Sequence, residues 1–290
     1  QEPYDYLLVQ GDTTTCMAAS LAAFYAGVKI GHVEAGLRTY DKFHPYPEEA
    51  NRKIIDAVAD LYFAHTDNAK NNLLKEGIEE NRIEVTGNTV IDALKEVAST
   101  EFAFSARPLE QISQDSRKII LVTAHRRESF GEPFESICNG LRDLAANYKN
   151  EVLLVYPVHL NPNVQEVAKR ILAGIDNILL IDPLDYLPLV QLMKRSHLVL
   201  TDSGGLQEEA PSLGKPVLVM RKVTERQEGV EAGTLKLVGM DADDIVREAS
   251  RLLNDPAEYQ AMATRANPYG DGTASVKIVQ KILAEMGPAG

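Results

Sequence analysis

The chain has 290 residues, 44% of them hydrophobic and 25% charged, which is ordinary for a globular protein of one large or two medium domains. Its formal net charge of −12 argues against a nucleic-acid-binding protein, because phosphate backbones reward clustered lysine and arginine. No apolar run approaches the roughly 20 residues that cross a bilayer, so no membrane association is expected. Cys16 and Cys138 lie far apart in helix-like segments and are expected to be reduced, which favours a cytoplasmic location.

Short apolar segments alternate with helical segments from the start of the chain. The first predicted strands are residues 6–10, 28–33, 61–64 and 82–85. Of the helices between and after them, one ends near residue 25, one opens at residue 48, and two cover residues 68–76 and 90–97. This alternation predicts a parallel sheet with helices on both faces.

A polar stretch over residues 99–117, with Pro108 in its middle, interrupts the pattern and is the expected linker. A second alternation follows it, with predicted strands at residues 119–123, 152–156, 178–181, 198–200, 217–220 and 234–238. We therefore expect two doubly wound α/β domains, residues 1–98 and 118–272. The last helix, within residues 273–290, is expected to pack back on the first domain.

Polar side chains gather where the predicted strands end. Those that follow a strand directly are Asp12, Glu34, the segment 125–128 (HRRE), His159, Asp182 and Ser203. Glu48 and Arg52 follow one loop later. Ligands of parallel α/β sheets bind at the carboxyl ends of the strands, so this placement favours a functional site over scattered surface charge.

The segment 198–216 has the pattern of an anion-binding turn. An apolar strand is followed by the turn Asp202-Ser203-Gly204-Gly205 and by a predicted helix over residues 206–213. Backbone N–H groups at the positive end of a helix bind phosphate, and glycines allow a ligand to approach closely. Glu209 on that helix could accept hydrogen bonds from sugar hydroxyls. An ordinary strand–turn–helix with a solvated acidic face fits the same residues.

Metal and cofactor fingerprints are missing from the sequence. No His-x-x-x-His spacing occurs, and Arg126 with Arg127 could neutralise a diphosphate without a metal ion. Neither Gly-x-Gly-x-x-Gly nor Gly-x-x-x-x-Gly-Lys-Thr occurs, so no cofactor is expected. We expect His44, His65 and His197 to be loop or core residues.

A series of ordered motifs covers essentially the whole chain. They are VQGDTTT at 9–15, HVEAGLRT at 32–39, PEEANR at 47–52, TGNTVID at 86–92, HRRESFG at 125–131, YPVHLNP at 156–162, TDSGGLQEE at 201–209, GKPVLVMR at 214–221 and TER at 224–226. This series resembles the bacterial non-hydrolysing UDP-N-acetylglucosamine 2-epimerases. The resemblance implies the B-type glycosyltransferase fold, with two Rossmann-like domains and parallel sheets.

The resemblance also implies a reaction. Members of this family interconvert UDP-N-acetylglucosamine and UDP-N-acetylmannosamine by eliminating UDP to 2-acetamidoglucal and adding it back with inversion at C2. Asp12, Glu34 and Glu48 match the catalytic carboxylates, and Asp12 is our leading candidate for handling the C2 proton. Which carboxylate acts on which face stays open. His125 matches a catalytic histidine that stabilises or protonates the leaving diphosphate.

Binding roles follow from the same resemblance. It implies that Ser203, Gly204 and Gly205 hold phosphate, that Glu209 binds the ribose and that Arg226 contacts the nucleotide. Leu184 and Leu189 occupy positions that line the uracil in members of the family. Arg126 and His159 lie in motifs associated with a second, activating UDP-N-acetylglucosamine site. The family further implies a homodimer.

One departure from the family concerns the start of the chain. Members begin with a strand leading to a Gly-Thr-Arg-Pro-Glu segment that does not occur here, so roughly 80 residues of the first domain are expected to be missing. Three alternatives stay open: a hydrolysing epimerase, a B-type glycosyltransferase with an acceptor site, and a non-catalytic UDP-sugar sensor.

Overall fold

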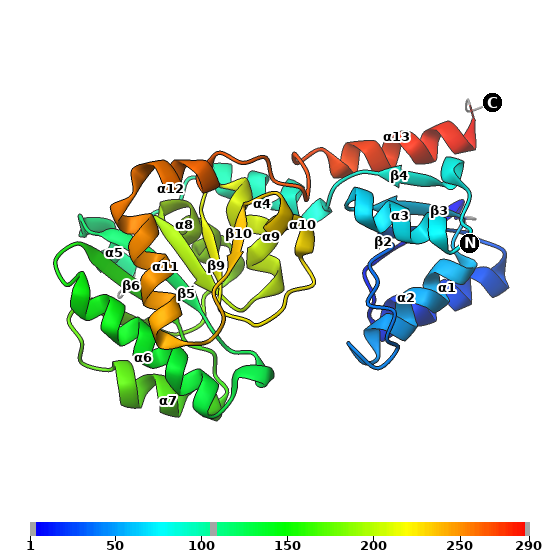
Figure 1. Cartoon of the computed structure of the whole chain (residues 1–290). Helices are drawn as coiled ribbons and strands as arrows, with labels where there is room; N and C mark the ends of the chain where they lie inside the picture. The colour runs from blue at the N-terminus through cyan, green and yellow to red at the C-terminus, as the bar shows by residue number, and fades with distance from the viewer. Residues whose placement is uncertain (1–3, 105–108, 288–290) are drawn as a thin grey trace. The chain divides into compact units, whose positions relative to one another are not determined.

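The computed structural model describes residues 4–104 and 109–287. The chain divides into two compact units (Figure 1). The first unit combines Gln1–Ala93 with Pro268–Gly290, and the second is Leu94–Asn267. Among the described residues, no helix has the length and apolar character needed to cross a membrane.

The first unit is a parallel four-stranded sheet in the order β1-β2-β3-β4. Its strands are β1 (Tyr6–Gln10), β2 (Lys29–Ala35), β3 (Leu61–Ala64) and β4 (Ile83–Val85). Its helices are α1 (Thr14–Ala26), α2 (Glu48–Val58), α3 (Asp67–Lys75), the short 3₁₀ turn η1 (Glu80–Arg82) and the last helix α13 (Ala274–Met286). Helix α4 (Thr89–Ser99) runs across the boundary between the units.

Local chemistry explains where the functional turns of this unit form. The Thr13 hydroxyl accepts a hydrogen bond from the Cys16 backbone N–H and so caps α1 directly after the Asp12 turn. Helix α13 joins the same unit, because the Asp92 carboxylate accepts hydrogen bonds from the backbone N–H groups of Ala274 and Ser275. These caps fix the loops at the carboxyl end of the sheet.

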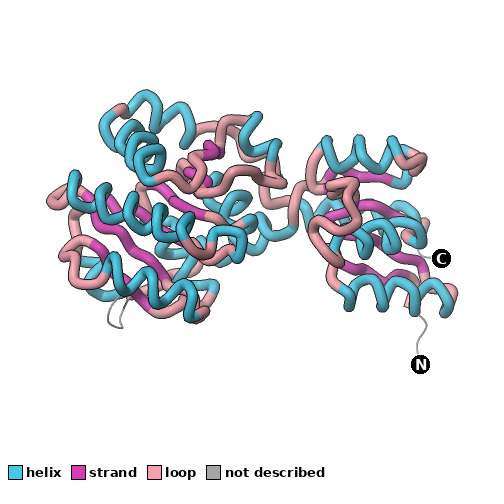
Figure 2. The backbone as a smooth tube through the Cα atoms, turned by 60° about the horizontal axis from the view of Figure 1, so that its bottom comes forward, coloured by secondary structure: helices cyan, strands magenta, loops and turns pink. Residues whose placement is uncertain are grey.

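The second unit is a parallel six-stranded sheet in the order β10-β9-β8-β5-β6-β7. Its strands are β5 (Lys118–Thr123), β6 (Val152–Pro157), β7 (Ile178–Ile181), β8 (Leu198–Thr201), β9 (Val217–Val219) and β10 (Leu235–Leu237). Its helices are α5 (Leu109–Gln114), the 3₁₀ turn η2 (Arg127–Ser129), α6 (Glu132–Asn147), α7 (Pro162–Leu172), α8 (Tyr186–Arg195), α9 (Gly204–Ser212), α10 (Gln227–Glu231), α11 (Ala242–Asn254) and α12 (Pro256–Ala263). Separate buried clusters lie on the two faces of this sheet, under helices that Figure 2 shows in cyan.

The strand order of the second unit places its binding loops. From β5 the chain runs outward through β6 and β7, and then returns to build β8 on the other side of β5. Thr123 and Thr201 are register partners at the carboxyl ends of β5 and β8. This pair marks a topological switch point, where loops diverge and leave room for a ligand.

The predicted α/β fold with parallel sheets is confirmed, and some elements differ in detail. Residues 109–114 of the expected linker form α5, since Ile112 is buried in the core of the second unit, while Pro108 lies outside the described residues. The sequence pattern also missed α10, which is only one short turn long. Helix α9 begins at Gly204 and not at residue 206, with Ser203, a residue type that favours helix starts, at its N-cap position.

Candidate active site

Asp12 lies in the turn after β1, held by residues of α2. Asn51 Nδ2 donates to the Asp12 backbone oxygen at 2.8 Å. Arg52 Nε donates to Asp12 Oδ2 at 2.9 Å, and Arg52 Nη2 is 2.7 Å from the same oxygen. The Asp12 side chain is 27% exposed, so its carboxylate is oriented by the arginine and still open to solvent on another side.

Glu34 lies inside β2, one residue before the strand ends, and not after the strand as predicted. The pairing of β2 with β3 shifts register between Val33 and Ala35, and Glu34 at this bulge has φ = 67°. The left-handed region costs a non-glycine residue of order 1–3 kcal/mol and is concentrated at functional sites. The bulge turns the Glu34 carboxylate toward the Asp12 turn, since a Cβ added at Gly11 would lie 3.5 Å from Glu34 Oε2.

Glu48 and Glu49 open α2 and differ in environment. Glu49 is fully buried and accepts hydrogen bonds from the backbone N–H groups of Thr39 and Tyr40 and from Arg52 Nη1. Glu48 is partly exposed and stands three and four residues before Asn51 and Arg52, on the same helical face. The structure therefore brings Asp12 and Glu34 together and places Glu48 on the helix that holds Asp12.

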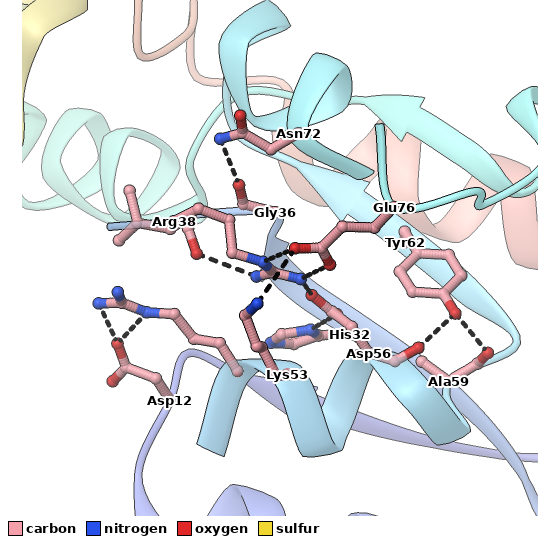
Figure 3. A network of polar contacts seen from close by, with 12 residues as sticks. Asp12, His32, Gly36, Arg38, Lys53, Asp56, Ala59, Tyr62, Asn72 and Glu76 are labelled. Carbon is pink, nitrogen blue, oxygen red and sulfur yellow. Dashed lines mark hydrogen bonds and ion pairs between the residues drawn. The ribbon is translucent and has the colours of Figure 1, made fainter. Parts of the chain in front are cut away.

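A buried network of charges lies behind this turn, and no sequence pattern indicated it. Figure 3 shows the Arg38 guanidinium bonded to the carboxylates of Glu76 and Asp56, with the His32 ring beside Asp56. The Arg38 side chain is fully buried, and its bonds to Glu76 and Asp56 raise its pKa although burial opposes them. The one sequence feature that could have indicated this network is Asp56, an acidic residue directly after Ile55, which is buried on α2.

In the second unit, Asp202 organises the ends of β5 and β8. Thr123 Oγ1 and Thr201 Oγ1 are hydrogen-bonded at 2.6 Å. Asp202 Oδ2 accepts hydrogen bonds of 2.7 Å from the backbone N–H groups of both His125 and Arg126. Asp202 is completely buried, so the loop that carries His125 is anchored to the sheet by a carboxylate.

His125 is oriented by two neighbours. Its Nδ1 lies 3.6 Å from Asp202 Oδ1, which is buried and finds no hydrogen-bond partner among the described residues. Its ring stacks on His159, with centroids 5.3 Å apart and planes inclined by 14°. Burial lowers the pKa of His125, Asp202 opposes this, and the charges of His159 and Arg126 lower the pKa further.

The start of α9 concentrates positive charge. Ser203 occupies the N-cap position, and its backbone N–H donates to Thr201 Oγ1. A Cβ added at Gly204 would lie 3.3 Å from Arg226 Cζ and 3.5 Å from Arg126 Nη2. Both guanidinium groups therefore approach the N-terminus of the helix, an arrangement suited to a phosphate or diphosphate. The Arg226 guanidinium is held by Glu208, with Nη2 2.8 Å from Oε1.

Glu209 lies further along the same helix and has a partner that the sequence analysis missed. The Tyr186 hydroxyl donates to Glu209 Oε2 at 2.7 Å. Burial raises the pKa of Glu209, the hydrogen bond from Tyr186 lowers it, and the charge of Glu208 raises it. Leu184 and Leu189 are partly buried against the neighbouring core cluster and frame the start of α8.

Arg126 and His159 line one pocket of about 460 Å³ within this unit. The other lining residues are His125, Arg127, Glu128 and Asn161. Arg221 Nε donates to Glu128 Oε1 at 2.6 Å and so fixes one wall. The structure thus brings the proposed regulatory residues directly beside His125.

The remaining histidines lie in different environments. His44 is exposed and contacts Asp41, whereas His65 is buried. His197 stacks on Tyr259 with centroids 4.2 Å apart, and burial lowers its pKa to about 4. Over residues 4–104 and 109–287, no group of three or more histidine, cysteine, aspartate or glutamate side chains could hold a metal ion.

Comparison with proteins of known sequence identifies relatives of this chain. The family model described as UDP-N-acetylglucosamine 2-epimerase matches residues 1–283. The UDP-N-acetylglucosamine 2-epimerase of Salmonella typhimurium is 55% identical over 283 residues, which cover 96% of this chain and 75% of that protein. That of Bacillus subtilis is 52% identical over 98% of this chain and 73% of its own length.

Solved structures of proteins in this family have a similar fold. The UDP-GlcNAc 2-epimerase of Neisseria meningitidis bound to UDP-GlcNAc superposes with a TM-score of 0.87 at 48% identity, covering 97% of this chain and 76% of that one. The complex of MnaA from S. aureus with UDP gives a TM-score of 0.89 at 49% identity, with the same coverage of both chains. The chain therefore belongs to the UDP-N-acetylglucosamine 2-epimerase family.

Proposed function

We propose that this protein interconverts UDP-N-acetylglucosamine and UDP-N-acetylmannosamine by inverting C2 of the sugar. The observation that carries the proposal is that one chain of this family contains both the carboxylates around Asp12 and a helix start at Gly204 that two guanidinium groups approach. A complex of a relative with UDP-GlcNAc supports the substrate class.

The reaction is an elimination followed by an addition. A base removes the C2 proton, the bond between C1 and the diphosphate oxygen breaks, and UDP leaves behind 2-acetamidoglucal. The diphosphate oxygen then adds to C1, and a proton is delivered to the opposite face of C2. In this proposal Asp12, aligned by Arg52, handles the C2 proton. Glu34 and Glu48 serve as the partner acid or base and stabilise positive charge that develops at C1.

The groups proposed to bind UDP belong to the second unit. The Ser203 hydroxyl and the backbone N–H groups of Gly204 and Gly205 at the start of α9 stabilise the diphosphate together with Arg226. His125, as the imidazolium, donates a proton or a hydrogen bond to the leaving oxygen. Because these cations and dipoles are fixed before the reaction, the developing charge requires little reorganisation.

The nucleoside would bind along α8 and α9. Glu209 accepts hydrogen bonds from the ribose hydroxyls in place of the one from Tyr186, and Leu184 and Leu189 pack on the uracil. The pocket of about 460 Å³ that contains Arg126 and His159 is proposed to bind a second, activating UDP-N-acetylglucosamine.

Assembly and location follow the same family pattern. We place the protein in the cytoplasm as a homodimer, and the free thiols of Cys16 and Cys138 are consistent with a reducing compartment.

Proton NMR of UDP-N-acetylglucosamine incubated with the protein in deuterated water tests the proposal. We expect UDP-N-acetylmannosamine to form with deuterium at C2. Free N-acetylmannosamine with UDP would instead identify a hydrolysing epimerase. An unexchanged C2 proton and no product would overturn the catalytic proposal in favour of a glycosyltransferase or a UDP-sugar sensor.

A further inference from the structure

His32 is a buried histidine between two hydrogen-bond acceptors. It belongs to β2, is 1% exposed, and its Nδ1 lies 2.5 Å from Asp56 Oδ1 (Figure 3). Its Nε2 lies 2.9 Å from the backbone oxygen of Gly11, the residue before Asp12. A backbone carbonyl accepts hydrogen bonds and never donates them, so this second bond requires a proton on Nε2.

The hydrogen bond between His32 Nδ1 and Asp56 Oδ1 also needs a proton, which belongs either to the ring nitrogen or to the carboxyl group. The other oxygen of Asp56, Oδ2, accepts a hydrogen bond of 2.6 Å from Arg38 Nη2. Burial raises the pKa of Asp56, but Arg38 is a permanent cation, and its hydrogen bond and charge favour the ionised carboxylate and lower that pKa. Asp56 is therefore a carboxylate, and the proton between it and His32 belongs to the imidazole ring.

We infer that His32 is a doubly protonated imidazolium in the folded protein and that it positions the Gly11–Asp12 turn. A neutral imidazole carries one N–H and could satisfy only one of the two acceptors. The part of this inference that concerns catalysis rests on the proposed function, whereas the protonation state does not.

The surrounding charges explain how a buried cation is tolerated. Arg38 donates through Nε and Nη2 to the two oxygens of Glu76 and through Nη2 to Asp56. Lys53 Nζ lies 3.8 Å from Glu76 Oε1 at the outer end. Two cations, His32 and Arg38, thus face two carboxylates, Asp56 and Glu76, and a buried charge that is paired and hydrogen-bonded avoids most of its desolvation cost.

The turn is the point at which this network reaches the proposed catalytic centre. Gly11 has φ = 76°, its backbone N–H donates to the Val33 oxygen at 3.0 Å, and its oxygen receives His32. Asn51 holds the next carbonyl, that of Asp12. His32 is therefore a positioning residue: it fixes the backbone from which the Asp12 carboxylate projects, and a displacement of about 1 Å at such a site costs about a hundredfold in rate.

The protonation state is tested by NMR of the intact protein labelled with ¹⁵N-histidine. The protein has six histidines, and the His32 signals are those lost in the His32→Gln variant. We expect both ring nitrogens of His32 to carry protons at pH 7.5. A single protonated nitrogen would overturn the inference, whether or not the protein is an epimerase.

The positioning role is tested by two matched variants, Asp56→Asn and Glu76→Gln. Each neutralises one carboxylate that binds Arg38, but only Asp56 contacts His32. We expect Asp56→Asn to remove one His32 ring proton and to lower kcat about tenfold to a hundredfold with KM little changed. Glu76→Gln should keep both ring protons and change kcat less than about fivefold.

Thermal unfolding of both variants separates positioning from loss of folding. Equal losses of kcat in the two folded variants, or an Asp56→Asn variant that retains both ring protons, would contradict the inference. If the unsubstituted protein shows no epimerisation, the proposed function fails, and the NMR result on His32 still decides its protonation state. An Asp56→Asn variant that does not fold leaves the decision to that same measurement.

Discussion

The two units of the chain differ in how their charged groups are arranged. In the first unit the carboxylates are paired in advance: Asp12 with Arg52, and Asp56 with Arg38 and His32. In the second unit Arg126 and Arg226 converge on the amide dipoles at the start of α9, where positive charge is concentrated. The proposed function assigns acid–base work to the first arrangement and the binding of an anion to the second.

The largest expected effect is the loss of catalytic rate, without loss of UDP binding, when Asp12 is replaced. Asp12→Asn keeps the shape of the side chain and removes the base, so kcat should fall about a thousandfold. The affinity for UDP should stay within about threefold, because the proposed UDP contacts lie in the other unit. NMR turnover and calorimetric titration with UDP measure the two quantities. An Asp12→Asn protein that no longer binds UDP would contradict the assignment of UDP binding to the second unit alone.

Arg226→Gln is the complementary change in the second unit. It removes a guanidinium that approaches the start of α9, and the loss of a charge-assisted contact should weaken UDP binding about tenfold to a hundredfold. Arg117→Gln is the control, since Arg117 pairs with Asp115 in the same unit, away from α9. Comparable losses in the two variants would show that general charge, and not the anion site, governs affinity.

Asp202→Asn tests how the second unit controls its histidine. Asp202 opposes the effect of burial on the pKa of His125, so its neutralisation should lower that pKa further. If the imidazolium is the active form, the rate falls as pH rises through this pKa, and the falling limb of the pH–rate profile should move to lower pH. An unmoved limb would exclude Asp202 as the partner of His125. The profile of Arg117→Gln serves as the reference.

The smallest expected effect concerns the stability of the second unit. Because the pKa of Glu209 is raised in the fold, mainly by burial, its ionised form destabilises the folded state at pH above the unfolded value. Glu209→Gln should therefore raise the free energy of unfolding at pH 7 by up to about 1 kcal/mol, a gain that disappears in acid. Urea unfolding at pH 7 and pH 4 measures it. Weaker UDP binding in the same variant would add support for the ribose contact, and a loss of stability at pH 7 would contradict this account.

Sequence patterns predicted the fold well, and the reason is physical. Parallel strands buried on both faces read as short apolar runs, such as residues 61–64 and 198–200, and helices between them have their own period. The rule that ligands meet strand ends drew attention to Asp12 and His125 before their surroundings were known. The functional roles of these residues remain predictions.

What the patterns missed depends on contacts between distant segments. His32, Arg38, Asp56 and Glu76 come from β2, the loop after it, α2 and the end of α3, and nothing local indicates that they meet. The bond between Tyr186 and Glu209 likewise joins two helices. The left-handed backbone of Glu34 arises only from the bulge between β2 and β3.

The sequence by itself determined the alternation of strands and helices, the family and the kinds of side chain at the strand ends, because these depend on local periodicity and on ordered motifs. The tertiary structure alone decided which carboxylates are paired, that Asp202 anchors the His125 loop and that His32 lies between two acceptors. Hydrogen bonds and buried charges depend on distances of a few ångströms between residues far apart in the chain, and only the folded backbone sets those distances.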